Sequence, residues 1–327
     1  MGETRVKHLR FVGVLHVFAA GLVLLSASCA KAQPPKAPPG FIAEYNVKYV
    51  VDGDPAQTLD ILYPAEAPTK RLPLLVWIHG GGWTSGSKDQ QPYLGQLQRG
   101  YVVASLEYRF SQKAKFPAQI QDCQAAIRWL RANAARYHID PERIGVGGAS
   151  AGGHLSALVG VCGGQDKFPK IGGNEEQSDR VQAVCDIFGP TDFWTVVKQA
   201  EEDLTVKNIF QWNKGDPYSK LIGAKLGEDR EACEAVSPVT YVAKDNPPFL
   251  ILHGDRDALV PYAQSVEFAE RLEKAGVPVV LQRVPGAGHG GAPFANRKLA
   301  ELAAAFFDKH LQGRDVEIAP LPESAFP

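Results

Sequence analysis

The sequence lacks an excess of charge of either sign. Its 327 residues include 35 lysines and arginines and 36 aspartates and glutamates, a formal net charge of -1. Proteins that bind nucleic acid or an anionic membrane surface through charge carry a clear positive excess, so we expect neither partner. No two histidines stand at a metal-ligand spacing such as His-Glu-x-x-His. We therefore predict no metal site, and the sequence implies no cofactor.

Long hydrophobic runs are scarce as well, and we find no internal repeat. One stretch, residues 11–25, is mostly apolar, but it is short for a membrane span. Arg5, Lys7 and Arg10 precede it, and small residues follow it. A basic start, an apolar middle and a small-residue end are typical of a secretory signal peptide. We predict such a peptide over residues 1–32.

Two processing routes for this leader stay open. Residues 30–32, Ala-Lys-Ala, fit a small-x-small cleavage site before Gln33. Residues 25–29 resemble a bacterial lipobox, which would leave a lipid anchor on Cys29 as the protein's attachment to a membrane. Residues 33–40 contain several prolines and are predicted to form an extended linker. Either route exports the protein, to the periplasm or outside the cell.

Cysteine is also sparse, with five in the chain. Besides Cys29 they are Cys123, Cys162, Cys185 and Cys233. Four cysteines in an exported protein allow two disulfides in three connectivities. Cys123 lies in an apolar helix pattern and fits a buried free thiol. The other three flank the segment after the glycine-rich turn and a variable region, so the sequence leaves two states open for them, a bridge or free thiols.

Strand-like and helix-like segments alternate along the rest of the chain. An antiparallel pair opens it, at residues 45–51 and 58–63. The further strands are predicted at residues 74–78, 102–106, 144–147, 183–188, 249–252 and 279–284. The helices are predicted at residues 118–135, 262–275 and 296–311. Strands that alternate with helices indicate an α/β fold with a mostly parallel central sheet flanked by helices.

The regular pattern stops after the sixth predicted strand. Residues 190–236 carry aromatic side chains among charges and no clear strand, so we predict a small helical cap inserted into one domain that spans residues 41–315. Residues 316–327 form a C-terminal tail. The cap's aromatic residues would bind an aromatic acyl group or form the cap's own core. They are Trp194, Phe210, Trp212 and Tyr218.

The most informative motif is Gly-Ala-Ser-Ala-Gly at residues 148–152. It follows a strand-like run and opens a helix-like one, so Ser150 stands on a sharp strand-to-helix turn. Glycine two positions to either side leaves room for this strained turn. The helix that follows directs its first amides, including that of Ala151, toward the seryl oxygen. Ser150 is the predicted catalytic nucleophile.

A second glycine-rich segment follows the strand predicted at residues 74–78. It reads His-Gly-Gly-Gly-Trp, from His79 to Trp83. Glycines at this place leave backbone N–H groups free to face a substrate. We therefore predict an oxyanion hole formed by the N–H groups of Gly81, Gly82 and Ala151. Trp83 is the predicted substrate contact beside it.

Two later loops offer the partners that a serine nucleophile needs. One follows the strand at residues 249–252 and contains Asp255 and Asp257; the other follows the last strand and contains His289. A serine hydroxyl is a weak nucleophile until a base takes its proton, which is the role predicted for His289. A carboxylate orients that base and stabilises its imidazolium. The order along the chain is serine, aspartate, histidine.

The remaining histidines have plainer explanations. His79 and His253 end strands just before a glycine and are expected to hold loops through hydrogen bonds. His154 lies one turn into the helix after Ser150 and is expected to pack or hydrogen-bond. His138 and His310 belong to predicted helix ends at the surface.

These motifs together resemble α/β-hydrolase-fold esterases, in particular the bacterial BD-FAE-like group, similar to feruloyl and acetyl-xylan esterases. The hormone-sensitive-lipase-like carboxylesterases are similar too. In such enzymes the second aspartate of a His-Gly-Asp-x-Asp segment is the triad acid. The resemblance therefore implies Asp257 for that role and leaves Asp255 to brace its turn. Ala149 departs from the aspartate that lipase-like relatives often carry before the nucleophile.

The resemblance implies an exported serine carboxylesterase. It would hydrolyse small or carbohydrate-linked esters, of acetyl or feruloyl type, through an acyl-enzyme intermediate. A serine peptidase similar to prolyl oligopeptidases is one alternative, because it would use the same triad. A binding module on an inactive hydrolase fold is the other, although such a module normally lacks a triad member.

Overall fold

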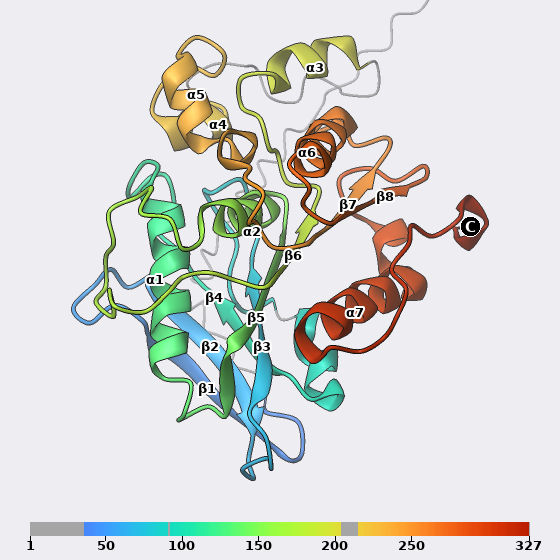
Figure 1. Ribbon diagram of the computed structural model, residues 1–327. Coiled ribbons are helices and arrows are strands. Elements are labelled where there is room, and N and C mark those ends of the chain that lie inside the picture. Colours follow the sequence, from blue (N-terminus) through green and yellow to red (C-terminus); the bar gives the residue numbers. More distant parts are fainter. Residues whose placement is uncertain (1–35, 91, 204–214, 327) are drawn as a thin grey trace, which may run out of the picture. The chain divides into compact units, whose positions relative to one another are not determined.

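The computed structural model describes residues 36–90, 92–203 and 215–326. Its centre is an eight-stranded sheet in the order β1-β2-β4-β3-β5-β6-β7-β8 (Figure 1). The pairs β1–β2 and β2–β4 are antiparallel, and the other neighbours are parallel. The predicted, mostly parallel sheet is confirmed. The strands are β1 Phe41–Lys48, β2 Thr58–Pro64, β3 Leu72–Ile78, β4 Val102–Leu106, β5 Ile139–Ala149, β6 Ala183–Ile187, β7 Phe249–Gly254 and β8 Val279–Val284.

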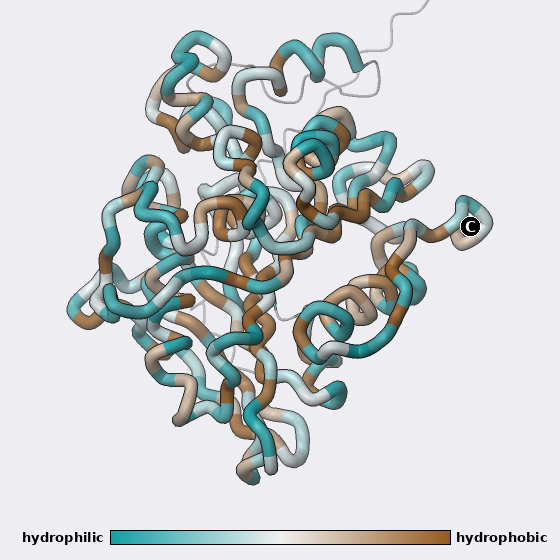
Figure 2. The backbone as a smooth tube through the Cα atoms, viewed as in Figure 1, coloured by the Kyte–Doolittle hydropathy of each residue, from teal (hydrophilic) through white to brown (hydrophobic). Residues whose placement is uncertain are grey.

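Helices cover both faces of this sheet and bury a separate core on each. One core takes side chains from α1, α2 and α6, and the other from η1 and α7. α2 is buried along its whole length, which agrees with a helix that is apolar all round. Figure 2 shows the hydrophobic colour concentrated along the central strands. The bounds are η1 Pro92–Arg99, α1 Ala118–Ala132, α2 Ala151–Cys162, α6 Tyr262–Lys274, η3 Ala292–Ala295, α7 Arg297–Gln312 and η4 Glu323–Ala325.

Two strands, β1 and β5, begin well before their predicted first residues because of pairing between distant residues. The first strand begins at Phe41, which pairs with Pro64, and not at residue 45. It ends at Lys48, since the chain then turns and the Gly53 N–H donates to the Val50 carbonyl (3.4 Å). The fifth strand likewise begins at Ile139, well before residue 144, because Ile139 pairs with Leu72.

The described residues between β6 and β7 form short helices joined by turns and irregular segments, without a strand. The helices are α3 Val196–Glu202, α4 Pro217–Ile222, α5 Arg230–Val236 and η2 Pro238–Tyr241. We call residues 190–236 the insert. Phe210 and Trp212, two of its predicted aromatic residues, lie outside the described residues. Tyr218 is buried, and Trp194 is half-buried with the Arg230 guanidinium 5.4 Å from its ring centroid.

Of the two states left open for Cys162, Cys185 and Cys233, a bridge or free thiols, the structure has free thiols. These three thiols and that of Cys123 are free and buried. Cys185 packs in the core shared with η1 and α7, whereas the other three pack in the core on the α1 and α2 face. Burial raises the pKa of each thiol because a thiolate is poorly stabilised in an apolar core. These cysteines behave as small apolar side chains.

The predicted leader and Cys29 lie outside the described residues, as do the first three residues of the predicted linker. Among the residues that the structure describes, no helix has both the length and the apolar composition needed to cross a bilayer. The same part of the chain contains no group of three or more side chains arranged to hold a metal ion.

Candidate active site

Ser150 occupies a strained turn between β5 and α2. Its backbone has φ 57° and ψ −121°, in the left-handed region that residues with a side chain rarely adopt. Both flanking glycines are required by close backbone contacts. A Cβ atom at Gly148 would clash with the carbonyl oxygen of Gly152, and one at Gly152 would clash with that of Ile78. The turn therefore presents the Ser150 hydroxyl at the carboxyl end of the sheet, at the start of α2.

Three side chains from different loops meet at this edge of the sheet. The His289 Nε2 atom lies 2.8 Å from the Ser150 Oγ atom, and its Nδ1 atom lies 2.6 Å from the Asp257 Oδ2 atom. Ser150 follows β5, Asp257 follows β7 and His289 follows β8. β5, β6, β7 and β8 are parallel, so their carboxyl ends lie on the same side of the sheet (Figure 1). The loops after β5, β7 and β8 therefore bring the three side chains together. The arrangement is a serine–histidine–aspartate hydrogen-bond chain.

The Asp257 carboxylate is buried and receives several donors. Its Oδ1 atom accepts the N–H groups of Leu259 (2.8 Å) and Val260 (2.9 Å), and its Oδ2 atom faces both His289 and His253. Burial alone would raise the pKa of Asp257, but hydrogen bonds from His253 and His289 hold it well below its ordinary value. Asp257 is therefore an anion throughout the neutral range.

Asp255 contacts the same loops but not the His289 imidazole. Its Oδ1 atom accepts the Gly286 N–H (2.7 Å), and its Oδ2 atom accepts from the Arg283 guanidinium (2.9 Å). It therefore braces the turn that precedes His289, rather than only its own turn.

The glycine-rich loop after β3 lies against Ser150. A Cβ atom at Gly80 would meet the Ala149 carbonyl oxygen at 2.6 Å, so the two backbones are in close contact. Gly81 and Gly82 have φ values of 114° and 59°, and both line the cavity at Ser150. Ala151 is the first residue of α2, whose positive dipole end faces the same place. The three residues predicted for the oxyanion hole thus lie in the loop and the helix start next to Ser150.

His79 and His154 hold this loop from two sides. The His79 Nδ1 atom is 2.7 Å from the Gly80 carbonyl oxygen, and its Nε2 atom is 2.7 Å from the Glu107 carboxylate. The Trp83 indole N–H donates to the His154 Nδ1 atom (3.2 Å), and the His154 Nε2 atom is 2.8 Å from the Val236 carbonyl. Burial lowers the pKa of His154 to about 4, so this ring is neutral. Both histidines hold loops through hydrogen bonds.

Trp83 is more buried than its predicted role requires. Its side chain is in the core, and its ring packs against those of His154, Phe193 and Tyr218. One part of the residue still lines the cavity at Ser150. Trp83 therefore forms a wall of the site and links the glycine-rich loop to the insert.

The cavity at Ser150 has a volume of about 280 Å³. Its lining is mostly apolar side chains and glycine. His289, which belongs to the hydrogen-bond chain, and Tyr218 are the titratable side chains in this lining. The full lining is Gly81, Gly82, Trp83, Ser150, Pro190, Pro217, Tyr218, Leu259, Val260 and His289.

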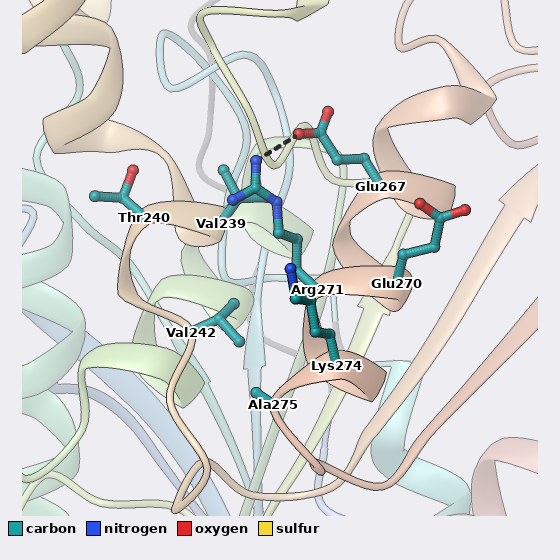
Figure 3. A pocket seen from close by; sticks show the side chains of 8 residues that line it. All are labelled: Val239, Thr240, Val242, Glu267, Glu270, Arg271, Lys274 and Ala275. Atoms are coloured by element: carbon teal, nitrogen blue, oxygen red, sulfur yellow. Dashed lines mark hydrogen bonds and ion pairs between the residues drawn. The ribbon is translucent and has the colours of Figure 1, made fainter.

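A larger cavity of about 700 Å³ lies elsewhere, between η2 and α6. Figure 3 shows charged side chains of α6 along it, with Arg271 paired to Glu267 at 3.2 Å. It contains no nucleophile beside a base, so volume alone does not identify the chemical site.

Several residues of the site escape sequence reasoning. Pro217 comes from α4 in the insert, where no local motif marks it. Tyr218 beside it is one of the aromatic residues predicted for the cap, and it lines the cavity. Phe188, at the end of β6, packs its ring 4.5 Å from that of His289. His253 contacts Asp257 as well as its own loop. Its place four residues before Asp257 at a strand end is a signal that could have suggested this contact.

The chain is similar to known esterases in sequence and in structure. The BD-FAE family model matches residues 59–272. Esterase LipC of Mycobacterium tuberculosis is 34% identical over 72% of this chain and 57% of its own, and Esterase LipQ of that organism is 31% identical over 77% and 62%. The chain thus spans less than two thirds of the length of these curated relatives.

Two solved structures are similar over most of the chain. A truncated carbohydrate esterase from gut microbiota superposes with a TM-score of 0.73, at 33% identity over 83% of this chain and 96% of that one. The esterase Est2 of Thermogutta terrifontis superposes with a TM-score of 0.63, at 29% identity over 86% and 97%.

Proposed function

The chain belongs to the BD-FAE family of α/β-hydrolases, and from this we propose that it is a serine carboxylesterase. It would hydrolyse small or carbohydrate-linked carboxylic esters through an acyl-enzyme intermediate. The observation that carries the proposal is the chain of hydrogen bonds from Asp257 through His289 to Ser150, beside a cavity with apolar walls.

In the proposed reaction, the Ser150 oxygen attacks the ester carbonyl carbon while His289 takes the hydroxyl proton. The N–H groups of Gly81, Gly82 and Ala151 would hold the negative oxygen of the tetrahedral intermediate. The intermediate then expels the alcohol, which receives the proton from His289, and leaves the acyl group on Ser150. Water, deprotonated by His289, releases the acid and restores the serine. Asp257 stays ionised and stabilises the imidazolium in both steps.

The size and walls of the cavity support a short, neutral acyl group. Its 280 Å³ is slightly below the range of about 300–1,000 Å³ typical of pockets that enclose a drug-sized ligand. Wall residues Trp83, Pro217 and Tyr218 leave limited room around Ser150. We therefore favour an acetyl or similarly short acyl group over a feruloyl group, with the alcohol portion directed outward. The carbohydrate esterase among the similar structures is consistent with a sugar alcohol.

The peptidase alternative has less support. An exopeptidase must bind a charged terminus of its substrate, and in the described lining no carboxylate, lysine or arginine faces the cavity. The inactive-module alternative has less support still, because the three triad side chains are at hydrogen-bonding distance. Export, with or without a lipid anchor at Cys29, is proposed on the leader pattern of residues 1–32 alone.

A matched substrate panel tests the proposal. The panel comprises p-nitrophenyl acetate, butyrate and octanoate, acetylated xylan, methyl ferulate and an aminoacyl p-nitroanilide, with Ser150→Ala as the blank. We expect hydrolysis of acetate above octanoate, none of the anilide, and loss of turnover in the variant. Cleavage of the anilide alone would replace the esterase by a peptidase, and full activity of Ser150→Ala would refute the mechanism.

A further inference from the structure

The hydrogen-bond chain at the site does not end at Asp257. His253 stands at the end of β7 and is completely buried. Its Nε2 atom lies 3.2 Å from the Asp257 Oδ2 atom and 3.0 Å from the Val260 carbonyl oxygen. Its Nδ1 atom lies 2.6 Å from the Ser265 Oγ atom, in the first turns of α6. Five side chains, from Ser265 to Ser150, are therefore connected in series.

The neighbours of His253 determine which ring nitrogen carries the proton. The Asp257 carboxylate and the Val260 carbonyl accept hydrogen bonds and cannot donate them. An unprotonated Nε2 atom would face two acceptors inside the core, so the proton is on Nε2. The Nδ1 atom then accepts the hydroxyl hydrogen of Ser265. In this tautomer every polar atom of the buried ring has a partner.

From this geometry we propose that His253 is a positioning residue for the triad acid. Its Nε2–H shares the Asp257 Oδ2 atom with His289, and its bond to the Val260 carbonyl holds the loop whose N–H groups bind Oδ1. His253 would thereby set the orientation of the carboxylate and withdraw part of its charge from His289. The inference rests on the proposed esterase function, since it assigns His253 a role in the same reaction.

The other groups around this pair are few. Tyr218 of α4 is near enough that the Asp257 charge adds to the effect of burial in raising its pKa. The Tyr262 ring of α6 lies 5.7 Å from that of His253. Asp255 of the same loop is paired with Arg283 of β8. The two histidines are thus the cationic or donor side chains that face Asp257 most closely.

Removal of the His253 N–H should change the pH dependence of the reaction, whereas a loss of packing alone should not. With one hydrogen bond fewer, the Asp257 carboxylate interacts more strongly with the imidazolium form of His289. The base then holds its proton more tightly, so the acid limb of the pH–activity profile moves to higher pH. A less well-oriented carboxylate also lowers kcat.

Two substitutions separate these effects. The amide of Asn can reproduce the Nδ1 contact with Ser265 but cannot reach Asp257, whereas the longer Gln can place an N–H near the Nε2 position. For His253→Asn we expect the acid limb of kcat/KM for p-nitrophenyl acetate to rise by roughly one pH unit and kcat to fall roughly tenfold. His253→Gln should return the limb close to its wild-type position. His310→Asn on α7, far from the site, controls for the substitution itself.

The proposal is overturned if His253→Asn lowers kcat without moving the acid limb, or if His253→Gln behaves like His253→Asn. Should the variants not fold, nitrogen-15 NMR of histidine in the wild-type protein gives the tautomer directly. We expect a protonated Nε2 and an unprotonated Nδ1 for His253 near neutral pH, and the opposite tautomer would refute the contact. If the wild-type protein hydrolyses no ester, the proposed function fails while this NMR test still decides the tautomer.

Discussion

Asp186 is a carboxyl group that the fold buries in the sheet without a cation beside it. It belongs to β6, is completely buried, and accepts one hydrogen bond, from the Gly189 N–H (2.9 Å). No described residue donates to its Oδ2 atom. Burial raises the pKa of Asp186 to about 7, because the anion is poorly stabilised there, and the bond from Gly189 offsets only part of this effect.

The raised pKa makes the free energy of unfolding depend on pH. Below about pH 4 the carboxyl is protonated in both the folded and the unfolded chain, so it imposes no penalty. As pH rises, the unfolded chain releases its proton first, and this favours unfolding progressively up to about pH 7. Asp186→Asn removes the titration. We expect the variant to gain stability relative to wild type between about pH 4 and about pH 7, measured by urea unfolding.

Asp166→Asn is the matched control for this comparison, because the Asp166 side chain is 86% exposed. The difference in free energy of unfolding between Asp166→Asn and wild type should stay small at about pH 4 and at about pH 7. A difference between Asp186→Asn and wild type that does not change with pH would show that Asp186 is ionised in the folded protein.

At the scale of elements, the glycine-rich loop after β3 joins three parts of the molecule. It contacts the turn at Ser150 through Gly80, it contacts α2 through the bond from Trp83 to His154, and His154 in turn binds the Val236 carbonyl at the end of α5. The loop is therefore held between the nucleophile turn and the insert. Gly81, Gly82 and Trp83 of this loop line the cavity at Ser150.

Gly81→Ala should disturb this loop directly. Gly81 has φ 114°, a region unfavourable for alanine, and a Cβ atom there would clash with the Ser85 carbonyl oxygen. The backbone must shift, which displaces an N–H of the proposed oxyanion hole. We expect kcat on p-nitrophenyl acetate to fall about 10²–10³-fold, as for the loss of one such donor, in a protein with a native circular dichroism spectrum.

Gly95→Ala is the corresponding control, because its φ is ordinary and no atom lies within 4 Å of the added Cβ position. Near wild-type kcat is expected for it. If Gly81→Ala also keeps wild-type kcat, the N–H groups of this loop do not stabilise the transition state.

At the scale of the whole molecule, stability comes from two apolar cores, one on each face of the sheet. The four described cysteines take part in these cores as buried thiols and form no covalent link between elements. The tail after α7 also packs onto the sheet: the Leu321 N–H donates to the Gln282 side chain of β8. Burial of apolar side chains, and not cross-linking, therefore holds the described residues together.

Two thiol measurements test this account. We expect a reducing agent to leave Tm unchanged, because no disulfide joins the described residues. A thiol reagent should label Cys123, Cys162, Cys185 and Cys233 only after denaturation, since burial keeps them protonated and out of reach. A drop in Tm on reduction would instead indicate a bridge.

Local features of this protein could be predicted from the sequence alone. The turn at Ser150 depends on a few neighbouring residues, since its glycines are required by contacts of the turn itself and of the adjacent strand. The parallel strands are apolar runs because they are buried on both faces, so their positions are evident in the amino-acid pattern. Ser150, Asp257 and His289 each follow one of these strands, so their order along the chain could also be predicted from the sequence.

Other features depended on the tertiary structure because they join residues that are far apart in sequence. The start of β1 depends on its pairing with β2, and the state of the cysteines depends on which face of the sheet each one reaches. The contact of His253 with Asp257 depends on the conformation of the loop after β7. The cavity walls at Pro217 and Tyr218 depend on where the insert packs against the rest of the domain. No local pattern encodes such distances, since they result from packing of the complete chain.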